Sequence, residues 1–189
     1  MNPASVIGIL WIAWFVSWWA AAGWSNRTVK RPALGRELPY RLIVIVGIIL
    51  LAGLYPHRFY SEIVLWRTGY TLGWAMVALA LAGFLFMWWA RIFLGKLWSA
   101  GVRIKADHRV IDSGPYSLVR HPIYTGIIVA GFATAVLRGT VAGFIGATIM
   151  TVSWYIKARM EERFLREQLG AEDYDAYARR VPMLVPFLK

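Results

Sequence analysis

The sequence contains no cysteine and few charged residues. Only 16% of its 189 residues are Asp, Glu, Lys or Arg, whereas about a quarter is usual in soluble domains. The absence of cysteine excludes disulfide bonds, thiolate metal sites and a cysteine nucleophile. Because there are only three histidines, the sequence also gives no basis for a histidine-built zinc site, and we predict no metal.

In place of charges, the chain has long apolar runs. Hydrophobic residues make up 59% of it, and its mean hydropathy is +0.52. Five uncharged stretches stand out: residues 1–26, 42–56, 68–90, 122–137 and 139–156. The second has only 15 residues and is too short for a hydrocarbon core of about 30 Å, unless residues 38–41 extend it. We therefore predict an all-α polytopic membrane protein with about five transmembrane helices.

The basic residues predict an orientation for these spans. The net charge is +11, but the basic residues alternate with uncharged runs and form no continuous stripe, which argues against nucleic-acid binding. Residues 27–41, 91–120 and 157–189 hold 18 of the 21 Lys and Arg and fall on one side of a five-span topology. By the positive-inside rule that side is cytoplasmic and the amino terminus is outside.

The last two predicted spans carry small residues four positions apart. These residues are Gly126, Ala130 and Thr134, then Gly139, Gly143, Ala147 and Thr151. Such spacing lets helix backbones approach closely in lipid, so we expect a tight hairpin that brings the segment before span four near the segment after span five. Tryptophans near the span ends, such as Trp19 and Trp89, predict an interfacial belt.

Residues with chemical capability are concentrated after position 100, in the blocks 108–116, 119–126 and 157–186. Pro122 suits the first turn of a helix, which puts Arg120 and His121 at a helix amino terminus that favours an anionic group. The alternative for Arg120 is a simple snorkelling anchor. The third block predicts a helix that continues span five and ends at Gly170, and then a short helix over residues 173–180.

Read together, the three blocks resemble the isoprenylcysteine carboxyl methyltransferase (ICMT) family. The similar runs are His-Arg-Val-Ile-Asp-Ser-Gly-Pro-Tyr at 108–116, Val-Arg-His-Pro-Ile-Tyr-Thr-Gly at 119–126, Glu-Glu at 161–162 and Tyr-Asp-Ala-Tyr-Ala-Arg-Arg-Val-Pro at 174–182. The resemblance covers about residues 95–189 and implies a methyltransferase region there. Residues 1–94 are then expected to be a three-span membrane region.

The resemblance implies that the cofactor is S-adenosyl-L-methionine and assigns roles to particular residues. The cofactor-binding set is His108, Arg109, Val110, Ile111, Tyr116, His121, Pro122, Ile123, Tyr124, Glu161 and Glu162. Arg120 and Arg180 are implied to be catalytic by holding the acceptor carboxylate. Lys157 and Arg180 are implied to contact the substrate, although relatives often have arginine at the position of Lys157.

This chemistry suits a lipophilic or prenylated acid that reaches the site from the membrane lipids. A carboxylate is already ionised at neutral pH, so its methylation needs no general base. Arginine grips a carboxylate with two parallel hydrogen bonds. Three alternatives stay open from the sequence: a phospholipid or amine N-methyltransferase, an NADPH-dependent sterol-type reductase, and a membrane scaffold without enzymatic activity.

Overall fold

The computed structural model describes residues 1–24, 28–30, 34–56, 62–98, 104–105, 111–169 and 171–188. Six α-helices form this part of the chain: α1 (Pro3–Ala20), α2 (Leu34–Ala52), α3 (Tyr70–Leu94), α4 (Pro122–Arg138), α5 (Val141–Leu169) and α6 (Ala171–Arg180). Three short 3-10 turns accompany them: η1 (Ala21–Gly23), η2 (Gly95–Leu97) and η3 (Gly114–Ser117). The strands β1 (Thr28–Lys30) and β2 (Ile104–Lys105) pair antiparallel. The predicted all-α architecture is confirmed, with this one small ladder added.

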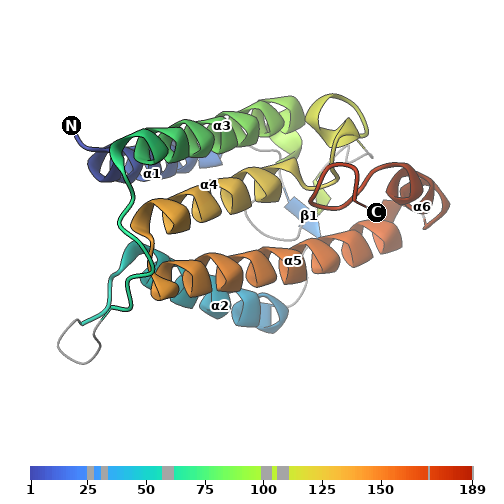
Figure 1. Cartoon of the computed structure of the whole chain (residues 1–189). Coiled ribbons are helices and arrows are strands. Elements are labelled where there is room, and N and C mark those ends of the chain that lie inside the picture. The colour runs from blue at the N-terminus through green and yellow to red at the C-terminus, as the bar shows by residue number, and fades with distance from the viewer. Residues whose placement is uncertain are drawn as a thin grey trace.

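Helices α1 to α5 lie side by side and run alternately in opposite directions (Figure 1). The two termini therefore lie at opposite ends of the bundle, and α6 extends beyond the end of α5. Local sequence signals set the helix limits. Pro122 stands in the first turn of α4, and Gly139 ends that helix in the left-handed conformation at φ 62°, which glycine adopts without steric cost.

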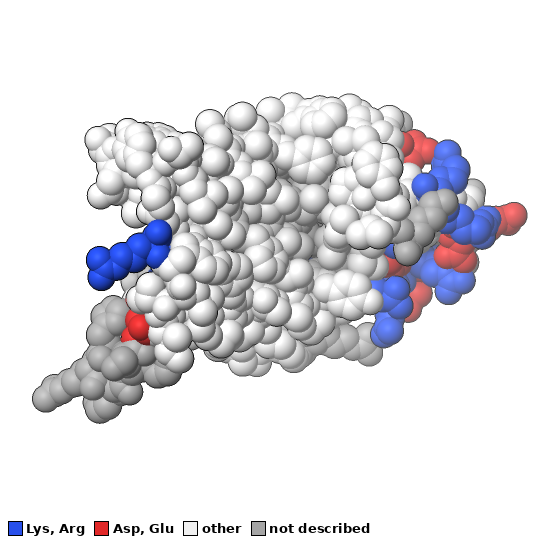
Figure 2. All heavy atoms as spheres, in the orientation of Figure 1, with Lys and Arg blue, Asp and Glu red and all other residues white. Residues whose placement is uncertain are grey.

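Within the described residues, three helices are long and apolar enough to cross a membrane, in the segments Pro3–Gly23, Tyr70–Leu97 and Val141–Glu167. Helix α4 is apolar but has only 17 residues, and α2 begins with charged residues that include Glu37 and Arg41. On the face drawn in Figure 2, charged side chains gather at the two ends of the bundle, mostly around α6, while its middle is uncharged. These features fit a polytopic membrane protein. Five complete crossings stay a prediction.

The three basic segments meet at one end of the bundle. Thr28 and Lys30 of β1 pair with residues 105 and 104 of β2, and Arg120 contacts Glu162 on α5. The described residues of segments 27–41, 91–120 and 157–189 thus share one end, as the charge pattern predicts. The side of the membrane on which this end lies stays a prediction.

Glycines bring two pairs of helices into close contact. A Cβ added at Gly83 of α3 would lie 2.6 Å from the carbonyl oxygen of Gly126 on α4. A Cβ added at Gly146 of α5 would lie 2.7 Å from the carbonyl oxygen of Gly47 on α2. Gly126 therefore packs on α3, which corrects the expectation that it faces span five. Gly143, in contrast, does face Ala135 of α4.

Buried Arg91 connects α1 to the end of α3. Its side chain is fully buried, and its guanidinium donates to the carbonyl oxygens of Ala21 (2.9 Å), Trp24 (2.7 Å) and Gly95 (2.7 Å). It also lies over the rings of Trp24 and Trp98, at 5.0 and 4.4 Å from their centroids. The cation thus satisfies carbonyl groups that the helix ends leave without partners.

The tryptophans near the span ends fall into two groups. Trp19 and Trp89 are exposed on the bundle surface, as an interfacial belt requires. Trp18 and Trp98 instead pack edge to face with their ring centroids 5.5 Å apart. Trp154 stacks on a tyrosine in the interior. The belt prediction therefore fits only the first group.

Candidate active site

The candidate site lies where α4 begins, beside the far part of α5 and the last turns of α6. Pro122 starts α4 and His121 precedes it as the N-cap residue. Helix α5 continues without a break past the apolar core, so it presents Lys157, Glu161 and Glu162 opposite that start. Six predicted residues meet here, and we call them the polar cluster: Arg120, His121, Tyr124, Lys157, Glu161 and Glu162.

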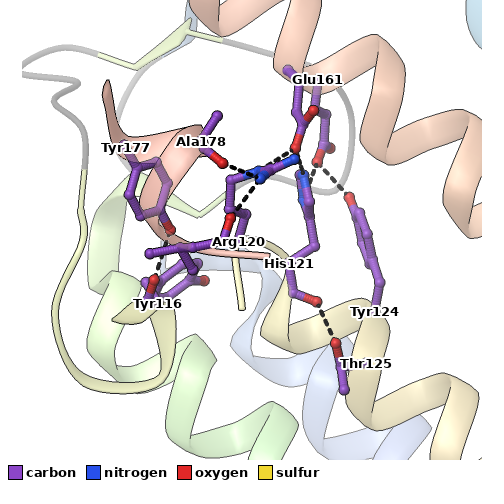
Figure 3. Close-up of polar contacts among 10 residues, drawn as sticks. Tyr116, Arg120, His121, Tyr124, Thr125, Glu161, Tyr177 and Ala178 are labelled. Carbon is purple, nitrogen blue, oxygen red and sulfur yellow. Dashed lines mark hydrogen bonds and ion pairs between the residues drawn. The ribbon is translucent and has the colours of Figure 1, made fainter. Parts of the chain in front are cut away.

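Arg120 is already engaged on three sides (Figure 3). Its Nε donates to Glu162 Oε1 at 2.7 Å, and its Nη1 donates to the carbonyl oxygens of Ala178 (3.0 Å) and Val181 (2.5 Å). The side chains of Arg120 and Glu162 are only 11% and 12% exposed. The guanidinium therefore fixes α6 against α4 and α5, and this is a role that the sequence does not reveal.

Glu161 lies between a ring hydroxyl and two cationic or ionisable groups. Tyr124 donates its hydroxyl to Glu161 Oε2 at 2.6 Å, and His121 Nδ1 lies 3.7 Å from the same oxygen. Lys157 Nζ is 3.8 Å from the other carboxylate oxygen, Oε1, which exceeds an ordinary hydrogen-bond distance. A carboxylate accepts about four hydrogen bonds, so Glu161 keeps capacity for a ligand.

His121 is held between a ring and a carboxylate. It stacks on Tyr124 with the two planes only 4° apart and the centroids at 5.3 Å. Its Nε2 lies 3.2 Å from Glu162 Oε1. Glu162 contacts both Arg120 and His121 and so stabilises the protein framework. Glu161 instead faces the interior of the site.

Lys157 is buried in a box of aromatic rings. Its Nζ lies 5.2 Å from the ring centroids of Tyr124 and Trp154 and 5.9 Å from that of Tyr40. Only 5% of the lysine is exposed. Contacts with ring faces compensate in part for the lost hydration of the ammonium.

Tyrosines seal the side of the site next to α6. Tyr174 and Tyr177 pack with Val181 in a small apolar core. Tyr177 donates its hydroxyl to the carbonyl oxygen of Tyr116 at 2.7 Å. Burial raises the pKa of Tyr116 and of Tyr177 well above the usual range, so both phenols are protonated donors at neutral pH.

The segment after α6 runs along the start of α4 and is attached through its backbone. Amide groups and one hydroxyl from the α4 side donate to three consecutive carbonyl oxygens. The bonds are Arg120 N to Pro182 O (2.8 Å), His121 N to Met183 O (3.1 Å) and Thr125 Oγ1 to Leu184 O (2.6 Å). We call these three bonds the seam. They close the side of the site that is formed by residues 182–184.

Arg180 lies apart from the polar cluster, on the surface. Its Nη2 donates to Asp112 Oδ2 at 3.1 Å, and the two side chains are 67% and 49% exposed. Arg180 lines an open cavity of about 440 Å³ together with Leu118, Pro182, Pro186 and Phe187. This cavity combines a guanidinium with apolar walls.

The other predicted cofactor-binding residues lie partly at the site and partly outside the described residues. Pro122 and Ile123 form the first turn of α4, and Tyr116 joins the site through Tyr177. Ile111 is described but makes no hydrogen bond with the polar cluster among the described residues. His108, Arg109 and Val110 lie outside the described residues, so their predicted contact with adenosine stays a prediction.

Two residues of the site were not predicted from the sequence. Tyr40 comes from α2, 117 positions before Lys157, and no short motif connects them. Trp154 looked like a membrane anchor, yet its ring stacks on Tyr124 at 5.0 Å between centroids. Its position one turn before Lys157 on α5 was the available signal, since residues three apart share a helix face.

Comparison with known proteins locates a family match in this region. Residues 76–167 match the isoprenylcysteine carboxyl methyltransferase (ICMT) family, a stretch that includes the whole polar cluster. Similar relatives are a methanethiol S-methyltransferase of Crocosphaera subtropica, 36% identical over 73 residues, and a protein-S-isoprenylcysteine O-methyltransferase of Xenopus laevis, 33% identical over 86 residues. A probable protein-S-isoprenylcysteine O-methyltransferase of Oryza sativa subsp. indica is 26% identical over 102 residues.

These similarities cover only parts of the proteins compared. The matched stretches make up 39%, 45% and 53% of this chain for the Crocosphaera, Xenopus and Oryza proteins. They make up 28%, 30% and 53% of those relatives themselves. The chain thus spans at most about half the length of these relatives.

Proposed function

Since the chain belongs to the ICMT family through residues 76–167, we propose that it is an S-adenosylmethionine-dependent methyltransferase of the membrane. The acceptor in this proposal is the carboxylate of a lipophilic, isoprenylcysteine-like molecule. One observation carries the proposal: the family-matched stretch contains all six residues that meet in the polar cluster at the end of the bundle. The residue roles and the cytoplasmic location of the site are part of the proposal.

The residues present fit the cofactor. S-adenosylmethionine supplies a methyl group bonded to a positively charged sulfur, and it carries a ribose diol, an ammonium and a carboxylate. Glu161 retains acceptor capacity beside its bond from Tyr124, so it would hold the ribose hydroxyls or the ammonium. The indole Nε1 of Trp154 is buried and, within the described part of the chain, has no hydrogen-bond partner, as expected for a site that receives a ligand.

The acceptor would be held from two directions. Lys157 provides a buried positive charge beside Glu161, and Arg180 provides an exposed one in the cavity lined by Leu118 and Phe187. Apolar walls beside a cation suit a molecule with a hydrophobic body and an anionic end. Because a carboxylate with a pKa of about 4 is ionised at neutral pH, none of these residues has to remove a proton.

A thiol acceptor is the second candidate. It is favoured by the similarity to methanethiol S-methyltransferases and by the histidine that lies 3.2 Å from Glu162. A thiol with a pKa of about 8.5 is mostly protonated at neutral pH and needs a base. His121, oriented by the Glu162 carboxylate, is the residue that would accept that proton.

Methyl transfer from labelled S-adenosylmethionine tests both candidates. Purified protein is given N-acetyl-S-farnesylcysteine, methanethiol or a membrane lipid extract, and the labelled product is identified. With the carboxylate acceptor we expect an ester product and a rate that changes little between about pH 6 and pH 8. A thioether product, formed at a rate that rises with pH over that range, would instead establish the thiol acceptor. A product methylated on an amine would contradict both.

A further inference from the structure

Residues 185–188 follow the seam and form an apolar turn that the bundle does not cover; we call them the terminal turn. The amide of Leu188 donates to the carbonyl oxygen of Val185 at 3.2 Å and so closes this turn. Three of its four side chains are exposed: Val185 by 51%, Phe187 by 97% and Leu188 by 67%. Large apolar side chains that are exposed together in this way mark a surface for another protein or for a membrane.

The seam directs the terminal turn toward the apolar body of α4. Pro182 and Met183 are bonded to residues 120 and 121, which precede this helix, whereas Leu184 is bonded to Thr125, which lies inside it. In Figure 1 the segment accordingly returns from α6 to the start of α4. The terminal turn therefore begins beside the first turn of an apolar helix, not beyond the end of the bundle.

Exposed apolar residues also connect the terminal turn with α3, which is long and apolar enough to cross a membrane. Pro186 and Phe187 line the open cavity together with Leu118, which is 44% exposed and directly follows η3. Within η3, a Cβ added at Gly114 would lie 2.6 Å from Cε2 of Phe93 on α3. The exposed apolar face of α3 then continues along this helix through Ile92 (60%), Trp89 (47%) and Leu85 (60%).

Phe187 has a backbone conformation that a bulky residue rarely adopts. Its φ of 68° lies in the left-handed region, which is sterically unfavourable for a large side chain and which glycine adopts without this penalty. With 97% of the residue exposed, packing on the described part of the chain does not compensate for the strain. Strained residues are retained at functional positions, so the position of this ring indicates a use outside the chain.

We propose that the terminal turn inserts into the membrane interface, with Val185, Phe187 and Leu188 at the boundary between headgroups and acyl chains. Insertion removes their apolar surface from water, and Phe and Leu side chains are typical of segments that lie at this depth. Arg180 lines the same cavity and is exposed, so it can keep its charge among the headgroups. The partner is the bilayer because the apolar surface is continuous with the outer face of α3. This inference goes beyond the proposed function and requires only that the bundle spans a membrane.

The absence of cysteine from the chain allows a direct test. Single cysteines are introduced into the full-length protein, labelled with a small fluorophore, and studied in liposomes that contain lipids brominated near the headgroup end of their acyl chains. The test variant is Leu188→Cys, which keeps Phe187. Glu172→Cys on α6 is the water-exposed control, and Leu85→Cys on α3 is the lipid-exposed control.

Brominated lipid should quench the label at position 188 about threefold more strongly than the label at position 172, and aqueous iodide should show the reverse order, because the inserted turn lies below the headgroups. Adding Phe187→Ser to Leu188→Cys should shift both values toward those of position 172. Iodide quenching at 188 equal to that at 172 would overturn the proposal. Protection from iodide without quenching by brominated lipid would also overturn it and would indicate contact with a second copy of the chain. The measurement uses neither cofactor nor acceptor, so its failure leaves the methyl-transfer proposal intact.

Discussion

Replacing either arginine of the family motifs by lysine should have very different consequences for the fold. Arg120 donates three hydrogen bonds, to Glu162 and to the carbonyl oxygens of Ala178 and Val181. Lysine keeps the positive charge but has a single ammonium in place of the planar guanidinium. It can therefore donate either to Glu162 or to the carbonyl oxygens, but not to both. Among the described residues, Arg180 pairs with the exposed Asp112.

The contacts set the size of the effect. In Arg120→Lys at least two hydrogen bonds from a charged donor are lost, and each contributes about 1.5 kcal/mol or more. We therefore expect the free energy of unfolding to fall by about 3 kcal/mol, with α6 separating first because two of the bonds end on it or just after it. In Arg180→Lys an exposed ion pair is altered, and the change should stay below about 0.5 kcal/mol.

Chemical unfolding of the full chain in detergent micelles measures the difference, and limited proteolysis after α6 reports its separation. Arg180→Lys is the matched control, since it makes the same substitution in the same region of the chain. Equal stability of the two variants would refute the structural role assigned to Arg120. An Arg120→Lys variant that is stable yet inactive in methyl transfer would instead favour direct contact with the acceptor.

Three further predictions follow from the described contacts. Glu161→Gln should weaken S-adenosylmethionine binding by about 1.5–3 kcal/mol in calorimetry, while Glu167→Gln, on the exposed part of α5, should not; unchanged affinity in the first would discard Glu161 as a ligand. Gly126→Ala should destabilise the bundle by about 1–3 kcal/mol, because its Cβ would meet the Gly83 carbonyl oxygen at 2.5 Å, whereas Gly8→Ala meets nothing within 4 Å; equal melting temperatures would contradict this packing. A cysteine placed at the exposed position 172 should resist an impermeant thiol reagent applied to intact cells, and its labelling from outside would reverse the predicted orientation.

The sequence predicted the helices well because their signals are local. Uncharged runs located α1 and α3, Pro122 marked the first turn of α4, and Gly170 marked the boundary between α5 and α6. The resemblance to the ICMT family also singled out the members of the polar cluster, because they lie in two short blocks of the sequence. Such features depend on neighbours along the chain and can be read without a structure.

Other features depend on which helices become neighbours, and these were missed or misjudged. Gly126 was expected to face span five but packs on α3, where it and Gly83 let the two helix backbones approach closely. Tyr40 reaches the site only through the packing of α2 on α5. For Arg120 the motif identified an important residue. The carbonyl groups to which it donates, however, lie 58 or more positions later in the chain, in α6 and just after it.

The seam between the end of the chain and α4 has a consequence for how this protein can change. All three bonds of the seam end on main-chain oxygens, those of residues 182–184, and so the side chains of Met183 and Leu184 are not needed to form it. These side chains can be exchanged while the closure persists. Sequence change at these two positions therefore leaves the closure intact, because main-chain oxygens alone accept the bonds that form it.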